Sequence, residues 1–231
     1  MESDISTSRV SGFTLVEILV AVAILAILSA ALTPLVIKYV NDGRRARALS
    51  DSQAIGQAIL AFNLDSGLWP VNNDANINDR GELSRLVSLS QAGITPAAIP
   101  RGAGVAPGDN RWRNLGNAGA LEDHLIFNRT DTVDPLYPPS ASPPQPPGWN
   151  GPYLQTIPVD PWNRPYVCNV RYLDGGGVAG VTPLEEDEHA VMCLSAGPNG
   201  LFETSFNDAT ALDGPGGDDI GWMLQGNQTR P

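Results

Sequence analysis

The sequence contains few of the residues on which metal binding, thiol chemistry and nucleic-acid binding depend. It has two histidines and two cysteines in 231 residues. Because no Cys-x-x-Cys pair occurs, we expect neither zinc binding nor redox catalysis. Lysine and arginine number 14 against 25 aspartates and glutamates, which gives a net charge of −11 at pH 7. Phosphate binding needs clustered Lys and Arg, so we expect no nucleic-acid partner.

Motifs typical of enzymes are also absent. The sequence has no Gly-x-Ser-x-Gly, no Walker loop and no His-Glu-x-x-His, so we predict that the chain is not an enzyme. A membrane-anchored hydrolase that uses its acidic pairs is the alternative, and it would show turnover as a purified soluble fragment. Glycine and proline are plentiful, at 24 and 20 residues, which predicts a loop-rich soluble domain.

Charge is nearly missing from a long stretch near the N-terminus, residues 13–37. Its 25 residues contain one charged side chain, Glu17. As a helix rising ~1.5 Å per residue, the stretch would be roughly 38 Å long, which exceeds the ~30 Å hydrocarbon core of a bilayer. A secretory signal peptide has a shorter apolar core of ~7–15 residues. We therefore predict one membrane-spanning helix.

Glu17 is the exception in this apolar stretch. A carboxylate at the centre of a membrane helix costs on the order of 2.5–3.5 kcal/mol, and less near an end, so it usually has a partner. If the chain were cut after Gly12, Glu17 would lie one helical turn from the new amino group of Phe13. In an assembly it would instead neutralise the amino terminus of a neighbouring subunit. The third interpretation is an acid that reaches the membrane interface and has no further role.

The segment Gly12-Phe13-Thr14-Leu15-Val16-Glu17, between a short polar leader and an apolar helix, resembles the class III signal of type IV pilins and type II secretion pseudopilins. The resemblance implies that a prepilin peptidase cuts after Gly12 and methylates Phe13 to N-methylphenylalanine, and that Glu17 is the assembly carboxylate. It also implies a pilin-like α+β fold, in which a long N-terminal helix packs on a small antiparallel sheet with extended loops. Pro34 matches a position where the superfamily often has proline, and we expect the helix to loosen or kink there.

The second half of the predicted helix is amphipathic. Between Ala46 and Leu64, one face is marked at spacings of three and four by Ala48, Ser52, Ile55, Ile59 and Phe62. The helix should run from Phe13 to about Asp65 and pack its second half on the soluble domain. We predict four parts: a leader (1–12), a transmembrane and filament-core helix (13–40), an amphipathic helix half (41–66) and a periplasmic globular domain (67–231).

Two signals for membrane orientation disagree. The basic residues Lys38, Arg44, Arg45 and Arg47 follow the apolar run, and the positive-inside rule alone would place them in the cytoplasm. The resemblance implies the opposite orientation, with the leader in the cytoplasm and the C-terminal domain in the periplasm of a bacterial inner membrane. We adopt this second orientation because a dedicated signal sets it.

Residues 71–150 are the hardest part of the sequence to interpret. Glu82 to Leu89 favours a short helix, and Leu121 to Phe127 a short helix or strand. Trp112 is predicted to anchor a loop, with a stacked surface contact as the alternative. His124 has no second His or Cys at metal-ligand spacing, so we predict a structural or surface role for it.

A proline-rich block, Gly151 to Tyr166, precedes two predicted strands, Tyr166–Leu173 and Ala190–Ser195. The strands should form an antiparallel hairpin. The succession Gly-Pro-Tyr-Leu, Pro-x-Asp-Pro-Trp and Pro-Tyr in this block resembles the major pseudopilin of type II secretion. Cys168 and Cys193 lie on the two strands, and they either form a disulfide outside the cytoplasm, which we favour, or remain two buried thiols.

The C-terminal loops carry the only ligand chemistry that we predict. Calcium takes about six to eight oxygen ligands, which flexible glycine-rich loops with carboxylates and amide oxygens supply. The resemblance to the major pseudopilin implies such a site, and its ligands are predicted to be Leu194, Asn199, Asp213, Asp218 and Asp219. Asn199 stands where the family's turn has an aspartate, which lowers the negative charge. The alternative is a tight turn at Asn199 with solvated aspartates.

These features predict a structural subunit of a type II secretion pseudopilus that drives export of folded proteins. The resemblance implies a helical homo-oligomer with other minor pseudopilins. The further partners that it implies are the prepilin peptidase, an inner-membrane platform with its cytoplasmic ATPase, and the membrane. Because residues 71–150 exceed the family's usual middle region, a minor type IV pilin or competence pseudopilin, for adhesion, motility or DNA uptake, is the alternative.

Overall fold

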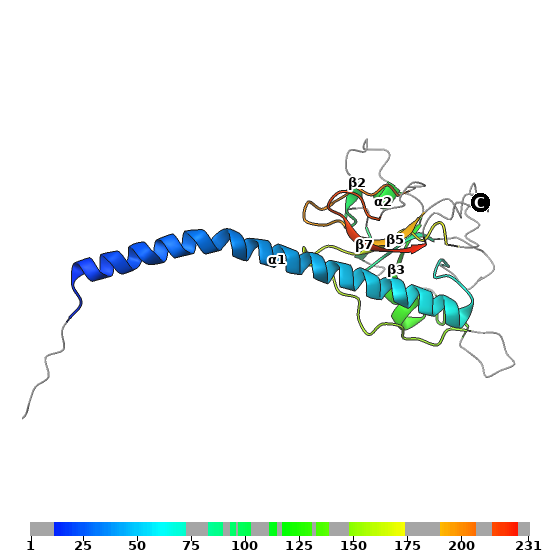
Figure 1. The fold of residues 1–231 in the computed structure, drawn as a ribbon. Coiled ribbons are helices and arrows are strands. Elements are labelled where there is room, and N and C mark those ends of the chain that lie inside the picture. The colour runs from blue at the N-terminus through cyan, green and yellow to red at the C-terminus, as the bar shows by residue number, and fades with distance from the viewer. Residues whose placement is uncertain are drawn as a thin grey trace, which may run out of the picture. The chain divides into compact units, whose positions relative to one another are not determined.

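The computed structural model describes residues 12–72, 83–89, 93–95, 97–102, 111–114, 117–130, 133–138, 148–173, 190–206 and 214–225. Contacts within the chain define two compact units, Met1–Gly43 and Arg44–Pro231, and each is treated by itself. Helix α1, Leu15–Ser66, contributes residues to both units (Figure 1). The other helices and the strands belong to the second unit.

Helix α1 is one helix of 52 residues. Residues 12–47 are all exposed, whereas the last part of the helix buries one face. The buried residues are Ala48, Ser52, Ile55, Gly56, Ala58, Ile59, Phe62 and Ser66. This face contains the whole predicted stripe, which is thereby confirmed. Pro34 lies inside the helix, and the expected loosening or kink there stays a prediction. The helix ends at Ser66, and the next residue, Gly67, adopts a φ of 68°.

The second unit contains a five-stranded sheet in the order β3-β1-β4-β5-β7. Its strands are β1 (Leu83–Val87), β3 (Asn117–Ala120), β4 (Val167–Cys168), β5 (Val191–Ser195) and β7 (Ile220–Gln225). Neighbouring strands are antiparallel except for the parallel pair of β1 and β3. A long helix with a small, mostly antiparallel sheet confirms the predicted α+β fold.

Two predicted elements differ from the structure. The helix expected at residues 82–89 is wrong, because Leu83–Val87 is strand β1, with all five residues buried between β3 and β4. A strand with both faces covered has no alternating pattern by which the sequence could reveal it. The strand expected at residues 166–173 is shorter than predicted. It is limited to β4 because the chain then turns, with the Leu173 N–H donating to the Val170 carbonyl.

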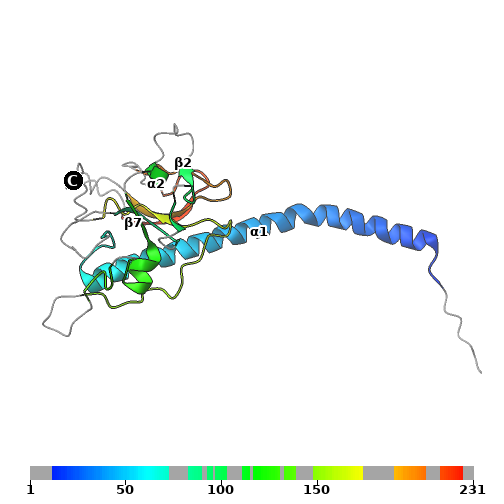
Figure 2. The same ribbon diagram turned by 180° about the vertical axis from the view of Figure 1, so that it is seen from behind.

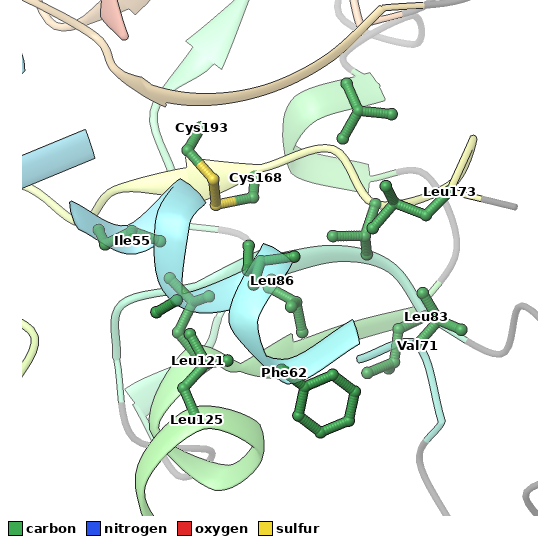
Figure 3. Close-up of a cluster of buried hydrophobic side chains, with 14 of the residues drawn as sticks. Ile55, Phe62, Val71, Leu83, Leu86, Leu121, Leu125, Cys168, Leu173 and Cys193 are labelled. Carbon is green, nitrogen blue, oxygen red and sulfur yellow. A yellow bond between two sulfur atoms is a disulfide. The ribbon is translucent and has the colours of Figure 1, made fainter. Parts of the chain in front are cut away.

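Side chains of the sheet alternate between two cores, as successive residues of a strand must. Leu86, Cys168 and Cys193 face the inner core, which also contains the buried face of α1. The Phe62 ring of α1 meets the Tyr137 ring edge-on, with 4.7 Å between centroids. Figure 3 shows side chains of α1, β1 and residues 121–125 converging in this core beside the two cysteines. The inner core therefore fixes the second half of α1 to the sheet.

The outer core lies on the opposite face of the sheet. Val87, Val167 and Met192, each next in sequence to an inner-core residue, point into it. Three short elements contribute to this side, namely α2 (Arg111–Asn114), β2 (Arg101–Gly102) and β6 (Leu201–Phe202), which pairs with β2. Part of the long middle region thus forms a second layer over the sheet.

Trp112 holds this second layer in place. Its ring is buried and stacks on Phe202, with 4.5 Å between ring centroids. Its indole Nε1 donates to the Thr204 carbonyl at 2.8 Å. Trp112 is therefore a loop anchor and not a surface contact.

His124 is also structural. It lies in the π-helical turn η2 (Asp123–Phe127), which both views show beside the C-terminal part of α1 (Figures 1 and 2). The ring is buried, and its Nδ1 lies 2.8 Å from the Tyr137 hydroxyl. Burial disfavours the charged form and lowers the pKa of His124 to about 3. The ring is therefore neutral at physiological pH.

Candidate functional site

The N-terminal motif lies at the first turn of α1. Gly12 and Phe13 precede the helix, which begins at Leu15, and the Phe13 side chain is 84% exposed. Thr14 stands at the N-cap position. The segment that a peptidase would cut is thus outside the helix and accessible, as cleavage of a peptide bond requires.

Thr14 and Glu17 form a capping box. The Glu17 Oε2 atom accepts hydrogen bonds from the Thr14 backbone N–H at 2.8 Å and from its hydroxyl at 2.9 Å. In return, the Glu17 N–H donates to the Thr14 Oγ1 at 3.3 Å. This reciprocal pattern satisfies backbone donors that the first turn would leave unpaired. The Thr-x-x-Glu spacing is a known sequence signal for it, and our sequence analysis overlooked it.

The capping box gives Glu17 a role inside its own chain. The carboxylate is exposed and bound through Oε2, and it stands at the start of the helix, where a negative charge is favourable. This local partner is compatible with a second contact to an amino terminus, and the three interpretations of Glu17 remain predictions.

Helix α1 is long and apolar enough to cross a membrane. The apolar side chains of residues 13–37 are exposed in the first unit. An exposed apolar surface of this length needs a nonaqueous environment. These features fit a single-pass protein anchored in an inner membrane.

Cys168 and Cys193 form a disulfide. They lie directly opposite each other on the antiparallel strands β4 and β5, and both are fully buried. The bond joins residues that are 25 positions apart in sequence and forms part of the inner core. Disulfides persist in oxidising compartments, so the bond suits a domain outside the cytoplasm.

The second candidate site consists of two segments, residues 196–204 after β5 and residues 216–219 before β7, which we call the acidic loop. Asp219 joins the two segments. Its Oδ2 accepts from the Glu203 N–H at 2.9 Å, the Thr204 N–H at 2.7 Å and the Thr204 hydroxyl at 2.6 Å. Burial raises the pKa of Asp219 to about 6 despite the hydrogen bonds from Thr204 and Glu203, and the nearby Glu203 charge adds to the increase.

Asn199 and Glu203 complete the acidic loop. The Asn199 N–H donates to Asp218 Oδ2 at 3.1 Å, and its side-chain Oδ1 accepts from the Leu201 N–H at 2.7 Å. The Asn199 Nδ2 donates to Glu203 Oε1 at 2.9 Å, and the Asp218 N–H donates to Glu203 Oε2. The sequence analysis did not include Glu203. No local sequence signal identifies it, because its place depends on contacts with the turn before β7.

Two carboxylate oxygens of the acidic loop are left without a hydrogen-bond donor among the described residues. Asp218 Oδ1 and Asp219 Oδ1 are buried and have no hydrogen-bond partner in the part of the chain that the structure describes. A buried anionic oxygen without a partner is costly unless it binds a cation or a donor. The predicted ligand Leu194 lies nearby on β5, where it pairs with Gly221, whereas Asp213 lies outside the described residues.

The acidic loop is not a ready-made metal centre. Among the described residues, no three His, Cys, Asp or Glu side chains are grouped closely enough to hold a metal ion. The structure brings Asn199, Asp218 and Asp219 together through hydrogen bonds, and a cation would need further oxygen ligands from neighbouring groups.

Two side chains of the proline-rich block, Arg164 and Asp160, hold the start of the acidic loop, and we call them the brace. The Arg164 guanidinium donates to the carbonyl oxygens of Gly197 at 2.5 Å and Pro198 at 3.4 Å. The buried Asp160 accepts from the Ser195 hydroxyl at 2.6 Å. Gly197 has a φ of 54°, and a Cβ there would lie 2.2 Å from the Asp218 carbonyl oxygen, so only glycine permits this approach.

Two protein families match parts of the chain. The prokaryotic N-terminal methylation motif matches residues 7–33. The family "Type II secretion system (T2SS), protein G" matches residues 128–177, which include the proline-rich block, the brace and strand β4. No solved structure matches the chain.

Three curated proteins are similar to it. Fimbrial protein EcpC of Eikenella corrodens is 28% identical over 56% of this chain and 88% of its own length. The type II secretion system core protein G of Pseudomonas aeruginosa is 27% identical over 68% of this chain and 70% of its own length. The type IV major pilin protein PilE1 of Neisseria gonorrhoeae is 32% identical over 29% of this chain and 31% of its own length.

The N-terminal motif, the long helix and the small sheet together define a pilin-like protein. The family matches and the similar proteins support its place in the superfamily of type IV pilins and type II secretion pseudopilins. Within that superfamily, the match over residues 128–177 and the similarity to core protein G support the G-type.

Proposed function

We propose that the chain is a structural subunit of a type II secretion pseudopilus and has no catalytic role. The observation that carries this proposal is the presence of a prepilin-type N-terminus and a protein G segment on one chain. The protein G segment supplies strand β4 and the brace to the second unit. The exposed apolar side chains of α1 are the surface through which subunits would associate.

Assembly follows from the surface of α1. Exposed apolar side chains along residues 13–37 favour either lipid or the equivalent helices of other subunits over water. Before assembly the stretch anchors the subunit in the inner membrane, and afterwards it lies in the core of a helical homo-oligomer. Glu17 sets the register by pairing with the amino terminus of a neighbour, since a carboxylate away from water requires a partner.

Processing precedes this assembly. A prepilin peptidase cuts between Gly12 and Phe13 and methylates the new amino group, and an inner-membrane platform with a cytoplasmic ATPase extracts the subunits. Other minor pseudopilins share the filament, which drives the export of folded proteins. The leader lies in the cytoplasm and the domain in the periplasm, and the Cys168–Cys193 disulfide supports this orientation.

The proposal is tested by deleting the gene and restoring it with variants. Loss of exoprotein secretion with intact twitching motility is expected, and Glu17→Ala should fail to restore secretion. Glu17→Asp, which keeps the charge, is the matched control and should restore part of it. Normal secretion with Glu17→Ala would contradict the role in assembly.

A minor type IV pilin, or a competence pseudopilin, is the second candidate function. The similarity to EcpC, which spans 88% of that fimbrial protein, and the similarity to PilE1 favour it. In that case the same deletion would abolish adhesion, twitching or DNA uptake and leave secretion unchanged.

We further propose that the acidic loop binds calcium. The unpartnered Oδ1 atoms of Asp218 and Asp219 support this, and Asn199 and the Leu194 carbonyl are further oxygen sources. A bound calcium ion would supply positive charge that holds residues 196–204 to the turn before β7. Calcium should therefore raise the Tm, and the double variant Asp218→Asn with Asp219→Asn should erase that gain. An unchanged Tm in saturating calcium would refute the site.

A further inference from the structure

Positive charge is concentrated in one turn of α1, shortly after its apolar part. Arg44, Arg45 and Arg47 fall within four residues at the start of the second unit, and all three are exposed. The remainder of this unit, residues 48–231, carries 9 basic and 21 acidic side chains. A local excess of positive charge on a strongly acidic protein favours an anionic partner at that position.

Arg47 already has a partner in its own chain. Its Nε lies 3.5 Å from the Asp51 Oδ2, and the Tyr166 hydroxyl donates to the same oxygen at 2.9 Å. Tyr166 directly precedes β4, so this network ties Arg47 to the sheet. No ion pair among the residues that the structure describes involves Arg44 or Arg45. These two guanidinium groups are therefore the ones available to a partner.

The position of Arg44 and Arg45 along the helix indicates which kind of anion they can meet. Residues 18–40 contain one charged side chain, Lys38, and as a helix rising ~1.5 Å per residue they extend roughly 34 Å. The hydrocarbon core of a bilayer is ~30 Å thick, and each headgroup layer adds about 5–8 Å. Arg44 follows Val40 by four residues, which is roughly 6 Å of helix. When residues 18–40 span the hydrocarbon, Arg44 and Arg45 thus lie at the depth of the phosphate groups.

We propose that Arg44 and Arg45 bind anionic phospholipids through the phosphate groups of the leaflet on the side of the soluble domain. The inference rests on the proposed anchoring of α1 in the membrane. A guanidinium group forms two parallel hydrogen bonds with a phosphate, and a headgroup with net negative charge adds an attraction that a zwitterionic headgroup lacks. Because the acidic remainder of the unit is repelled by the same surface, we expect the two arginines to carry this contact.

The test compares an anionic with a zwitterionic lipid on the full-length protein in detergent. The protein is titrated with phosphatidylglycerol and, separately, with phosphatidylcholine, and native mass spectrometry measures the bound lipid. The wild type should bind phosphatidylglycerol at least about tenfold more tightly, because each basic side chain near an anionic surface is worth about a fivefold gain in affinity. The double variant Arg44→Gln with Arg45→Gln should lose this preference. Equal affinity of the wild type for the two lipids would overturn the proposal.

Two further variants separate the position of the charge from its amount. Arg101→Gln with Arg129→Gln removes the same charge from exposed residues elsewhere and should keep the preference, whereas an equal loss there would overturn the proposal. Arg44→Lys with Arg45→Lys keeps the charge and should stay within a few-fold of the wild type.

The acidic surface of a second copy of the chain is the other anionic partner that the charges allow. If Arg44→Gln with Arg45→Gln keeps the lipid preference but weakens self-association, the arginines serve that contact and the lipid proposal fails. Because the assay does not measure secretion, its failure is distinguishable from failure of the pseudopilus proposal.

Discussion

The two units of the chain differ in how much of their apolar surface is buried. In the second unit, apolar side chains of α1 and of the sheet bury one another in two cores. In the first unit, the apolar residues between Leu15 and Val40 include many that are more than half exposed. Along the same helix the first buried residue is Ala48, shortly after the first unit ends at Gly43.

This difference shows which part of the protein is stable alone and which part depends on its surroundings. The second unit gains its stability from burial within one chain. The first unit has no such gain, so its environment must be lipid or other copies of the helix. Mutations should consequently separate into those that change folding and those that change assembly.

The largest difference in the free energy of unfolding is expected between Phe62→Ala and Leu28→Ala. Phe62 is fully buried in the inner core, and its truncation should lower the free energy of unfolding of the second unit by about 3–5 kcal/mol. Leu28 is 52% exposed and should change it by less than about 0.5 kcal/mol. Urea unfolding in detergent, followed by tryptophan fluorescence, measures both. Similar losses in the two variants would contradict the division into units.

The disulfide should come next in effect. Replacing both Cys168 and Cys193 by alanine removes a cross-link between residues 25 positions apart, which should cost about 2–4 kcal/mol. The loss should appear in the unfolding of the second unit and leave membrane insertion of α1 unchanged. If alkylation of the native protein without reductant labels both cysteines, the bond does not form in solution.

The pH dependence of the second unit should depend on His124. Its pKa of about 3 in the folded state lies below the ordinary value of 6.5, so the unfolded state binds more protons between these values. The contribution to stability is complete above pH 6.5 and is lost as the pH falls toward 3, by at most about 1.4 kcal/mol per pH unit.

A comparison with His124→Gln isolates this contribution, because all other titrating groups are shared. The wild type should lose stability more steeply than the variant between pH 6 and 4. This range lies between the ordinary pKa of histidine and the lowered pKa of His124. Parallel curves for the two proteins would show that the ring is not buried in its neutral form.

The smallest effect is expected at the first turn of α1. Thr14→Val removes the hydroxyl that pairs with Glu17 and should destabilise that turn by about 1 kcal/mol, whereas Thr14→Ser keeps the capping box. Hydrogen exchange of the amides at residues 15–18 in detergent should quicken in Thr14→Val alone. Equal exchange in both variants would argue against the box.

Long, regular patterns made much of the fold predictable. The apolar stretch of residues 13–37 and the stripe from Ala48 to Phe62 specify α1 by their length and spacing. The hairpin of β4 and β5 followed from two apolar runs separated by a loop. These signals are local, so no knowledge of distant contacts is needed to interpret them.

Strand β1 and its partner β3 could not be predicted from the sequence, because tertiary contacts determine where these strands form. The β3 sequence Asn117–Ala120 has little strand preference, and it pairs with β1 because Gly119 leaves room for the Leu83 side chain. A Cβ at Gly119 would lie 2.5 Å from the Leu83 Cδ1. The same holds for Glu203, whose place in the acidic loop depends on the pairing of β6 with β2 and on the turn before β7.

The identity of the first residue of the mature protein tests the central claim most directly. If α1 is an anchor that becomes a filament core, the leader must be removed before assembly. Intact-mass and N-terminal peptide mass spectrometry of the protein purified from its membrane should find a chain that begins with N-methylated Phe13. A mature chain that still begins at Met1 would contradict the account.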